Sequence, residues 1–322
     1  MMYAVRVHHF GGPEVLKWEQ IDKPKPGPGE VLVRIEAVGV NPVDTYVRSG
    51  ASGPRSFPYI PGTDGAGVVE GLGPEVDEWK VGDRVYLTGS LTGTYAQYAT
   101  CQVDLLFPLP EKVSFAQGAA IYVPYSTAYR ALFQRGRAKA GEWVLVHGAS
   151  GGVGLAAVQW AVSRGLNVIG TAGSEAGREA VLEQGAQHVL SHRQEGYMEE
   201  VVALTGGQGP ALIIEMLANL NLQKDLEIVA QHGRIVVVGN RGNLDFNPRA
   251  AMSKDADVLG LLLFNTPPEE MRDIQAAIGA GLQAGFLKPV VSRRFPLEQA
   301  HLAHQAVLEP GALGKIVLLP WV

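Results

Sequence analysis

The segment from Val144 to Gly154, VLVHGASGGVG, has the residue types and spacing needed to bind a dinucleotide. Its first three residues predict a short buried strand, and four glycines between positions 148 and 154 predict a tight turn. The next residues, LAAVQWAVSRG, have apolar side chains at helical spacing. Strand, glycine turn and helix in this order are typical of a unit whose helix N-terminus holds a pyrophosphate. The spacing is GxxGxxG instead of GxGxxG, so a plain structural turn is the alternative.

Ser150 in the same segment gives a second interpretation. The residues GASGG are similar to the nucleophile elbow of hydrolases, which also follows a strand and precedes a helix. The partners for a catalytic triad would be Asp225, Asp245 and His232. We favour the nucleotide site, because the glycine pattern continues into the helix and a hydrolase leaves the β-rich first half unexplained.

The end of the second strand indicates which dinucleotide binds. Thr171, Ala172 and Gly173 stand where an acidic side chain would bind the ribose 2′-hydroxyl of NAD. Without that carboxylate, a 2′-phosphate fits, and Ser174, Arg178 or His192 could contact it. NADPH is therefore the expected cofactor. The alternatives are a solvated helix face for the arginine and an ordinary strand-end position for the histidine.

The histidines and the single cysteine do not form a zinc site. Catalytic zinc needs three protein ligands, but Cys101 is the only cysteine and the chain has no CxxC motif. His301 and His304 are the one loosely spaced histidine pair, and an amphipathic helix explains them better. We expect a metal-free protein.

Composition excludes several classes of function. The 322 residues carry a formal charge of −5, which gives no basic surface for nucleic acid or anionic membranes. No secretion signal is recognisable at the N-terminus. The longest apolar run, Val258 to Phe264, is too short to span a bilayer. One cysteine fits a reducing compartment, so a cytoplasmic location is expected.

The chain changes character near residue 125. Residues 1–124 predict a β-rich domain, with strands expected at 3–7, 30–40, 65–73 and 83–89. After that point strands and helices alternate, as in a doubly wound parallel sheet. The expected strands are 144–147, 167–171, 188–190, 212–217, 234–238 and 258–264. The expected helices are 152–164, 175–184, 197–204 and 222–230. A helix at 268–284 and a strand at 314–320 follow, and the last strand is expected to rejoin the first domain.

Several motifs together resemble the medium-chain dehydrogenase/reductase superfamily: HGASGGVGLAAVQWA, GVNPVDTYVRSG, PYIPGTDGAGVV, VGDRV and PYSTAYRAL. IIEMLAN, VVVGNRG and GKIVLLP narrow the resemblance to the zeta-crystallin-like quinone oxidoreductases, over essentially the whole chain. The resemblance implies an α/β fold: a GroES-like catalytic domain, 1–124 and 267–322, and a Rossmann domain with a six-stranded parallel sheet, 125–266. NADPH would bind in the cleft between them.

The resemblance also implies site residues. Asn41 and Tyr46 would be the polar groups that face substrate and nicotinamide. The cofactor-binding positions that it implies are Tyr46, Thr127, Ser150, Gly151, Gly152, Val153, Gly173, His192, Asn221, Gly239, Arg241, Leu261, Leu262 and Leu263. Apart from the resemblance, we expect Arg178 from the charge argument above, and Val238 and Asn240 at the carboxyl edge of the sheet. For Gly239 to Arg241 a simple surface turn is the alternative.

Departures from the zinc-dependent members of the superfamily are informative. Asn41, Thr63 and Val123 stand where those enzymes carry zinc ligands, and Val43 stands where they carry a proton-relay hydroxyl. The resemblance therefore implies a zinc-free NADPH:quinone reductase. The alternatives are an enone or enoyl reductase of the same superfamily and, against the acidic charge, a cofactor-regulated RNA-binding protein. A homodimer or homotetramer is expected through strand 258–264, whose free apolar edge needs a partner.

Overall fold

The computed structural model describes residues 1–311 and 313–322, which fall into two compact units. The first unit consists of Met1–Val123, Lys288–Glu309 and Lys315–Val322, and the second of Pro124–Leu287 and Pro310–Gly314. The fold class is therefore the expected one: a β-rich GroES-like unit and a unit built on a parallel six-stranded sheet. None of the helices described is long and apolar enough to cross a membrane.

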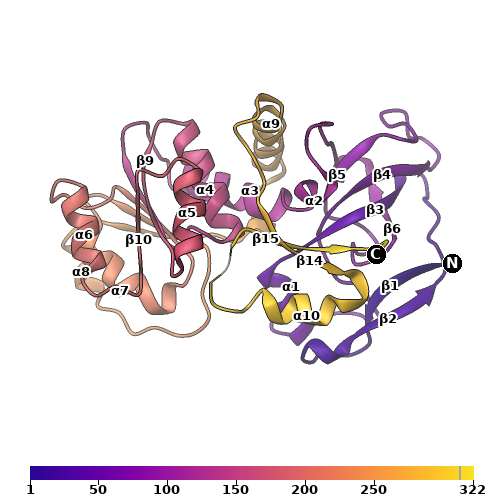
Figure 1. Ribbon diagram of the computed structural model, residues 1–322, viewed down its shortest axis with the longest axis horizontal. Coiled ribbons are helices and arrows are strands. Elements are labelled where there is room, and N and C mark those ends of the chain that lie inside the picture. The colour runs from indigo at the N-terminus through magenta and orange to yellow at the C-terminus, as the bar shows by residue number, and fades with distance from the viewer. Residues whose placement is uncertain (312) are drawn as a thin grey trace. The chain divides into compact units, whose positions relative to one another are not determined.

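The first unit is organised by a seven-stranded main sheet and a separate hairpin (Figure 1). The main-sheet strands are β3 (Glu30–Val40), β4 (Asp64–Leu72), β5 (Arg84–Thr88), β6 (Tyr98–Gln102), β7 (Leu106–Pro108), β14 (Val291–Pro296) and β15 (Lys315–Leu319). The order is β14-β15-β3-β4-β5-β7, with β6 also paired to β3. The hairpin strands are β1 (Met2–Val7) and β2 (Leu16–Ile21). The C-terminal strand β15 thus rejoins the first unit, as predicted.

Three neighbouring strands of this sheet bring distant residues together. β15 pairs antiparallel with β3, and β3 pairs antiparallel with β4, so that Gly39 lies opposite both Val317 and Asp64. Asn41 follows β3 directly and begins helix α1 (Pro42–Ser49). The end of β3 and the beginnings of β4 and β15 therefore meet at one end of the sheet. Helices α2 (Phe115–Gly118) and α10 (Ala300–Ala306) complete the unit.

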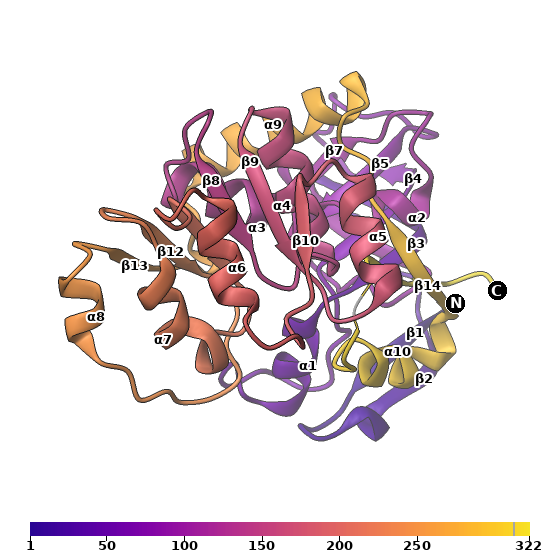
Figure 2. The ribbon, with the colours of Figure 1, turned by 60° about the vertical axis from the view of Figure 1, so that its left-hand side comes forward.

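The second unit contains one parallel sheet, which can be followed with its helices in Figure 2. Its strands are β8 (Trp143–Val146), β9 (Asn167–Thr171), β10 (His188–Leu190), β11 (Leu212–Glu215), β12 (Arg234–Val237) and β13 (Asp257–Gly260). The order is β10-β9-β8-β11-β12-β13. The central strands carry near-continuous apolar runs because helices cover both faces of such a sheet. Leu145, Ile169, Ile213 and Ile235 are fully buried accordingly.

The helices of this unit lie before, between and after these strands. They are α4 (Gly152–Ser163), α5 (Glu175–Glu183), α6 (Tyr197–Leu204), α7 (Ala218–Ile228), α8 (Pro248–Met252) and α9 (Pro268–Ala284), and α3 (Tyr122–Tyr129) runs into a π-helix, Arg130–Arg135. Helix α9 has its contacts in this unit: Gln275 donates to the Ser126 hydroxyl at 3.0 Å. The predicted boundaries assign residues 267–287 to the catalytic domain instead, and those boundaries stay a prediction.

One predicted strand is wrong in extent. The apolar run 258–264 does not continue as a strand, because β13 ends at Gly260 and a 3₁₀ turn follows at Leu263–Asn265. The N–H of Asn265 donates to the carbonyl of Leu262, which closes that turn. Arg130 donates to the same carbonyl at 3.3 Å, so the carbonyl of Leu262 is bonded to a turn and a side chain instead of a neighbouring strand. Apolar composition indicated burial of Leu263, but it did not indicate conformation.

Candidate functional site

The turn after β8 is built to approach an anion. Gly148 has φ +55°, which glycine adopts without strain. A Cβ on Gly154 would lie 2.5 Å from the carbonyl oxygen of Gly148, so only glycine allows this close approach. The N–H of Ala149 donates to the carbonyl of Thr171 at 2.8 Å and ties the turn to β9. The first-turn N–H groups of α4 have no intrahelical acceptor and lie at the positive end of the helix. The turn therefore fits a pyrophosphate.

Most of the predicted cofactor residues of the second unit lie at one edge of its sheet. Ser150–Val153 follow β8, Gly173 follows β9, His192 follows β10, Asn221 follows β11 in α7, Val238–Arg241 follow β12, and Leu261–Leu263 follow β13. The connections diverge on the two sides of β8, and ligands of open α/β sheets bind at such a switch point. The structure brings these residues to a common edge, and their contact with a cofactor stays a prediction.

Several predicted residues are buried. Thr127 lies in α3 and is 5% exposed, and Leu263 is 4% exposed. Leu262 beside it is exposed. In the first unit, Tyr46 lies in α1 and is half-buried. Its carbonyl accepts from the N–H of Ala51, so the backbone of Tyr46 is fixed by the end of its helix.

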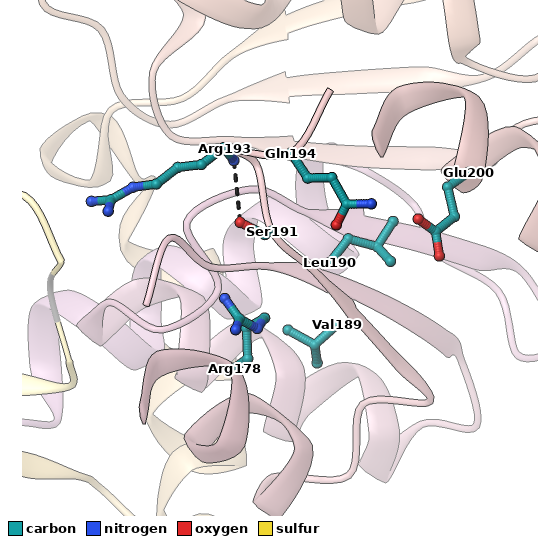
Figure 3. A pocket seen from close by; sticks show the side chains of 7 residues that line it. All are labelled: Arg178, Val189, Leu190, Ser191, Arg193, Gln194 and Glu200. Carbon is teal, nitrogen blue, oxygen red and sulfur yellow. Dashed lines mark hydrogen bonds between the residues drawn. The ribbon is translucent and has the colours of Figure 1, made fainter. Parts of the chain in front are cut away.

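An open hollow of about 580 Å³ lies beside the end of β10 (Figure 3). Its lining includes Arg178 from α5, Glu200 from α6, and Ser191 and Arg193 from the segment after β10. The N–H of Arg193 donates to the hydroxyl of Ser191 at 3.3 Å. Arg178 and Arg193 both line this hollow, and an arginine suits a phosphate because its guanidinium offers a fork of donors and a permanent charge.

Gly173 lies against the same basic segment. A Cβ at this position would lie 2.8 Å from Nε2 of His192 and 3.1 Å from Nε of Arg193. A larger residue would require the ends of these two side chains to shift, so glycine lets them lie close to the strand end. Arg193 was not among the predicted residues. The signal that could have indicated it is its place, directly after His192 at the end of a parallel strand.

A buried acid cluster lies beneath the cofactor edge. His147 follows β8, Glu215 ends β11, and Asp225 lies in α7. Nε2 of His147 lies 2.8 Å from Oδ1 of Asp225 and 3.6 Å from Oε2 of Glu215. Oε1 of Glu215 accepts from the N–H of Leu217 and from Nδ2 of Asn221 at 3.2 Å. The cluster thereby connects the glycine turn to the predicted cofactor residue Asn221.

Burial shifts the titration of this cluster. It raises the pKa of Asp225 to about 7 and of Glu215 to about 8, and it lowers the pKa of His147. Removing a charge from water disfavours the charged form of each group. The carboxyl groups therefore retain protons near neutral pH, and the imidazole is neutral.

The residues predicted as triad partners of Ser150 have other contacts or lie at the surface. Asp225 is bonded to His147, and His232 is a surface residue that lies 3.9 Å from Asp255. Asp245 is exposed. No triad around Ser150 forms from these residues.

The predicted catalytic residue Asn41 belongs to a second buried cluster, in the first unit. Its side chain is 3% exposed, and Nδ2 donates to Oδ2 of Asp64 at 3.0 Å. Nζ of Lys315 donates to the same Asp64 oxygen at 2.7 Å and also to Oδ1 of Asn41. Oδ1 of Asp64 accepts from the N–H of Val123 at 3.0 Å. Lys315 was not predicted, because a lone lysine at the start of a strand usually lies in solvent.

A chain of hydrogen bonds leads from Arg48 to the backbone N–H of Asn41. Arginine only donates, so Arg48 donates to Nδ1 of His304 at 3.1 Å, and Nε2 of that ring carries its proton. Nε2 donates to the Tyr95 oxygen at 2.9 Å, and the Tyr95 hydroxyl donates to Oδ2 of Asp44 at 3.2 Å. The same Asp44 oxygen accepts from the N–H of Asn41 at 2.8 Å. The chain fixes the backbone of Asn41.

Burial also sets the charge states in this chain. It raises the pKa of Asp44 to about 7, and together with the Arg48 charge it lowers the pKa of His304 to about 3. His304 lies in α10 with His301, so the pair is on a helix as expected, but His304 is buried and bonded to Arg48 and Tyr95 instead of lying on the helix surface. Its ring nitrogens are used by protein partners instead of a metal.

Comparison with known proteins agrees with both units. Residues 27–111 match the alcohol dehydrogenase GroES-like domain, and residues 152–278 match the zinc-binding dehydrogenase family. The chain is 48% identical to a quinone oxidoreductase of Homo sapiens over 322 residues, which cover 99% of this chain and 98% of that protein. It is 33% identical to a quinone oxidoreductase of Pseudomonas aeruginosa, with 99% and 100% covered.

Solved structures give the same result. The quinone oxidoreductase of Escherichia coli complexed with NADPH has a TM-score of 0.88 at 31% identity, with 99% of this chain and 100% of that chain covered. A structure described as an NAD-dependent alcohol dehydrogenase has a TM-score of 0.91 at 31% identity, with 99% of each chain covered. Likeness of fold alone therefore does not choose the substrate, whereas the full-length sequence relatives do. The chain belongs to the quinone oxidoreductase family of the medium-chain dehydrogenase/reductase superfamily.

Proposed function

We propose that this protein reduces quinones with NADPH and without zinc. The observation that carries the cofactor choice is the hollow that contains Arg178 and Arg193, beside a strand end that has no carboxylate at Thr171–Gly173. The full-length likeness to quinone oxidoreductases carries the substrate choice.

NADPH, when bound, supplies the reducing equivalents, and the chain's residues hold and orient it. The N–H groups of Ser150–Val153 bind the pyrophosphate, and the two arginines bind the 2′-phosphate. Asn221 and Gly239 border the cofactor at the neighbouring strand ends. The reduced quinone oxygens take protons from solvent, so the reaction needs no buried proton relay.

The cluster at Asn41 supports zinc independence. Lys315 places a buried positive charge against Asn41 and Asp64, next to the positions at which zinc-dependent members carry ligands. A second cation would be repelled by this ammonium. Thr63 and Val123 offer no imidazole or thiolate, so the donor set does not suit zinc.

An exposed sheet edge supports a homo-oligomer. β13 is the last strand of the parallel sheet, and Val258, Leu262 and Phe264 on and beyond it are 42%, 53% and 51% exposed. Pairing between two copies of β13 would satisfy the free backbone groups of this edge and cover the apolar side chains. Cys101, the single cysteine, is buried and supports a reducing compartment such as the cytoplasm.

Steady-state turnover tests the proposal. Purified protein is assayed with quinones, enones and enoyl thioesters, with NADPH and NADH in parallel. We expect quinone turnover with NADPH to exceed turnover of the other acceptors and of NADH. Preferred turnover of an enone or enoyl thioester would replace quinones as the substrate class, and preferred use of NADH would contradict the cofactor assignment.

A further inference from the structure

We propose that Lys315 is a positioning residue for the reaction: its buried ammonium holds the Asn41 amide so that one N–H remains directed to the carbonyl oxygen of the acceptor. The part of the statement that concerns the acceptor rests on the proposed function. The role of Lys315 toward Asn41 rests on the geometry of the first unit alone.

The chemistry of the two neighbours fixes the orientation of the amide. An ammonium has only donors and a carboxylate has only acceptors. Lys315 must therefore face Oδ1 of Asn41, and Asp64 must face Nδ2, as the hydrogen bonds show. A flipped amide would place its N–H groups against the ammonium and its oxygen against the carboxylate. Lys315 and Asp64 together allow only one orientation.

The fold has made room for this lysine. A Cβ on Gly39 would lie 2.8 Å from Cε of Lys315, 2.8 Å from Cβ of Asp64 and 2.0 Å from the carbonyl oxygen of Ala119. Because β15, β3 and β4 are neighbours, the lysine stem crosses the end of β3 at this glycine. The side chains of Lys315 and Asp64 are only 5% and 1% exposed. The pair is thus a packed part of the unit instead of a surface ion pair.

The fixed amide has one donor left. Nδ2 of Asn41 carries two hydrogens, and Asp64 takes one of them. A carbonyl oxygen that gains negative charge during reduction would accept the second hydrogen, and a donor oriented in advance stabilises that charge. An alcohol substrate would instead need its proton removed, for which the amide has no basic group. The arrangement therefore suits a carbonyl acceptor better than an alcohol.

The test must avoid leaving a single buried charge, because that alone could prevent folding. The double variant Lys315→Met/Asp64→Asn removes both charges and keeps an acceptor for the N–H of Val123. It is compared with Asn41→Ala and with the triple variant. For each variant, kcat and KM are measured with the best conjugated carbonyl acceptor of the wild type. The Kd for NADPH and the midpoint of thermal unfolding are measured on the same samples.

If Lys315 acts through Asn41, the double variant loses at least about tenfold in kcat/KM for the acceptor, as for a lost oriented donor. Its Kd for NADPH stays within about twofold, since the loops of the second unit are unchanged. The triple variant is no slower than Asn41→Ala, because effects through a shared residue do not add. Multiplied losses in the triple variant, wild-type turnover of the double variant, or wild-type turnover of Asn41→Ala would each overturn the proposal.

A second pair of variants checks the result without removing a charge. Gly39→Ala crowds the stem of Lys315, and its Cβ would also meet the carbonyl oxygen of Ala119 at 2.0 Å, so its turnover is compared only if its unfolding midpoint equals that of the wild type; kcat/KM should then fall. Gly71→Ala in the same sheet meets nothing closer than 3.9 Å and should not. A fully active, folded Gly39→Ala protein would count against the proposal. Failure of quinone reduction itself is distinguishable, because the cycle can be run with an enone if the wild type prefers one.

Discussion

Nε2 of His147 lies 2.8 Å from Oδ1 of Asp225, and both side chains are buried beneath the turn that is predicted to hold the pyrophosphate. Glu215 completes the cluster and accepts from Asn221. If both carboxyl groups and the imidazole were charged in this buried space, the cost in free energy would be large. The stability of the second unit therefore depends on the protonation of these three side chains.

This coupling predicts that the free energy of unfolding falls as pH rises toward the folded pKa values, up to about pH 7 for Asp225 and about pH 8 for Glu215. The folded pKa values of Asp225 and Glu215 are raised to about 7 and about 8, so the folded chain holds protons that the unfolded chain has released. For each carboxyl group that keeps its proton only in the folded chain, the free energy of unfolding falls by up to about 1.4 kcal/mol per pH unit as the pH rises. This fall stops at the folded pKa of the group. The lowered pKa of His147 acts in the opposite direction below about pH 6.5, since an unfolded histidine titrates near 6.5.

Asp225→Asn should flatten this decline, because the amide keeps an acceptor for His147 and cannot ionise. Thermal unfolding at pH 5, 6, 7 and 8 measures the effect, which should lie below about pH 7, with the exposed variant Asp245→Asn as the control. Glu215 remains in this variant, and Asp44 in the first unit has a pKa that is also raised to about 7, so these two groups account for a remaining slope. Equal slopes for wild type and Asp225→Asn would show that Asp225 does not titrate in this range.

Arg178 and Arg193 should select NADPH. Each lost charge-assisted hydrogen bond to a 2′-phosphate weakens binding by about 1–3 kcal/mol. Arg178→Ala and Arg193→Ala should therefore raise the Kd for NADPH and leave the Kd for NADH unchanged. Fluorescence titration of both cofactors provides the values, and Arg272→Ala on the exposed surface of α9 is the matched control. A parallel loss of NADH affinity would indicate a structural effect of the substitution.

Much of the fold could be predicted because local patterns determine it. Short apolar runs between glycines marked β9 and β10 with their observed bounds, and the helical spacing after residue 267 marked α9. Strands β6 and β7 and helix α1 were not predicted. They are short, and in α1 four of eight residues are β-branched or proline, so tertiary packing and not propensity determines them.

The candidate site was predictable only in part. The glycine turn and the strand ends follow from chain order, since parallel strands bring their carboxyl ends to one edge. Lys315, in contrast, is separated from Asn41 by 274 residues, and only the pairing of β15 with β3 brings them together. That Asn41 faces substrate stays a prediction: the residue is 3% exposed, and Lys315 and Asp64 bond its amide oxygen and one of its two amide hydrogens.

The edge of β13 should carry the contact between subunits. The N–H groups of Asp257 and Leu261 donate toward β12, so the alternate residue Val258 directs its N–H to the free edge. Val258→Pro removes this outward donor without removing a bond to β12 and should shift the oligomer to monomer. Val81→Pro, in an exposed turn of the first unit, is the control. Sedimentation at micromolar concentration gives the masses, and a wild-type monomer of 34.4 kDa would refute the assembly.

Quinone reduction should survive exhaustive chelation, and simple alcohols should not be oxidised. Alcohol oxidation requires removal of a hydroxyl proton, which zinc-dependent enzymes achieve by coordination and a side-chain relay. Here Lys315 places a positive charge beside Asn41 and Asp64, and Val43 carries no hydroxyl. Among the described residues, one group has metal-ligating atoms within 4.8 Å of one another: His147, Glu215 and Asp225. In this group His147 is already bonded to Asp225. Metal analysis before and after chelation, with assays of quinones and of ethanol to butanol, tests both claims. Stoichiometric zinc whose removal abolishes turnover, or alcohol oxidation comparable to quinone reduction, would require a different mechanism.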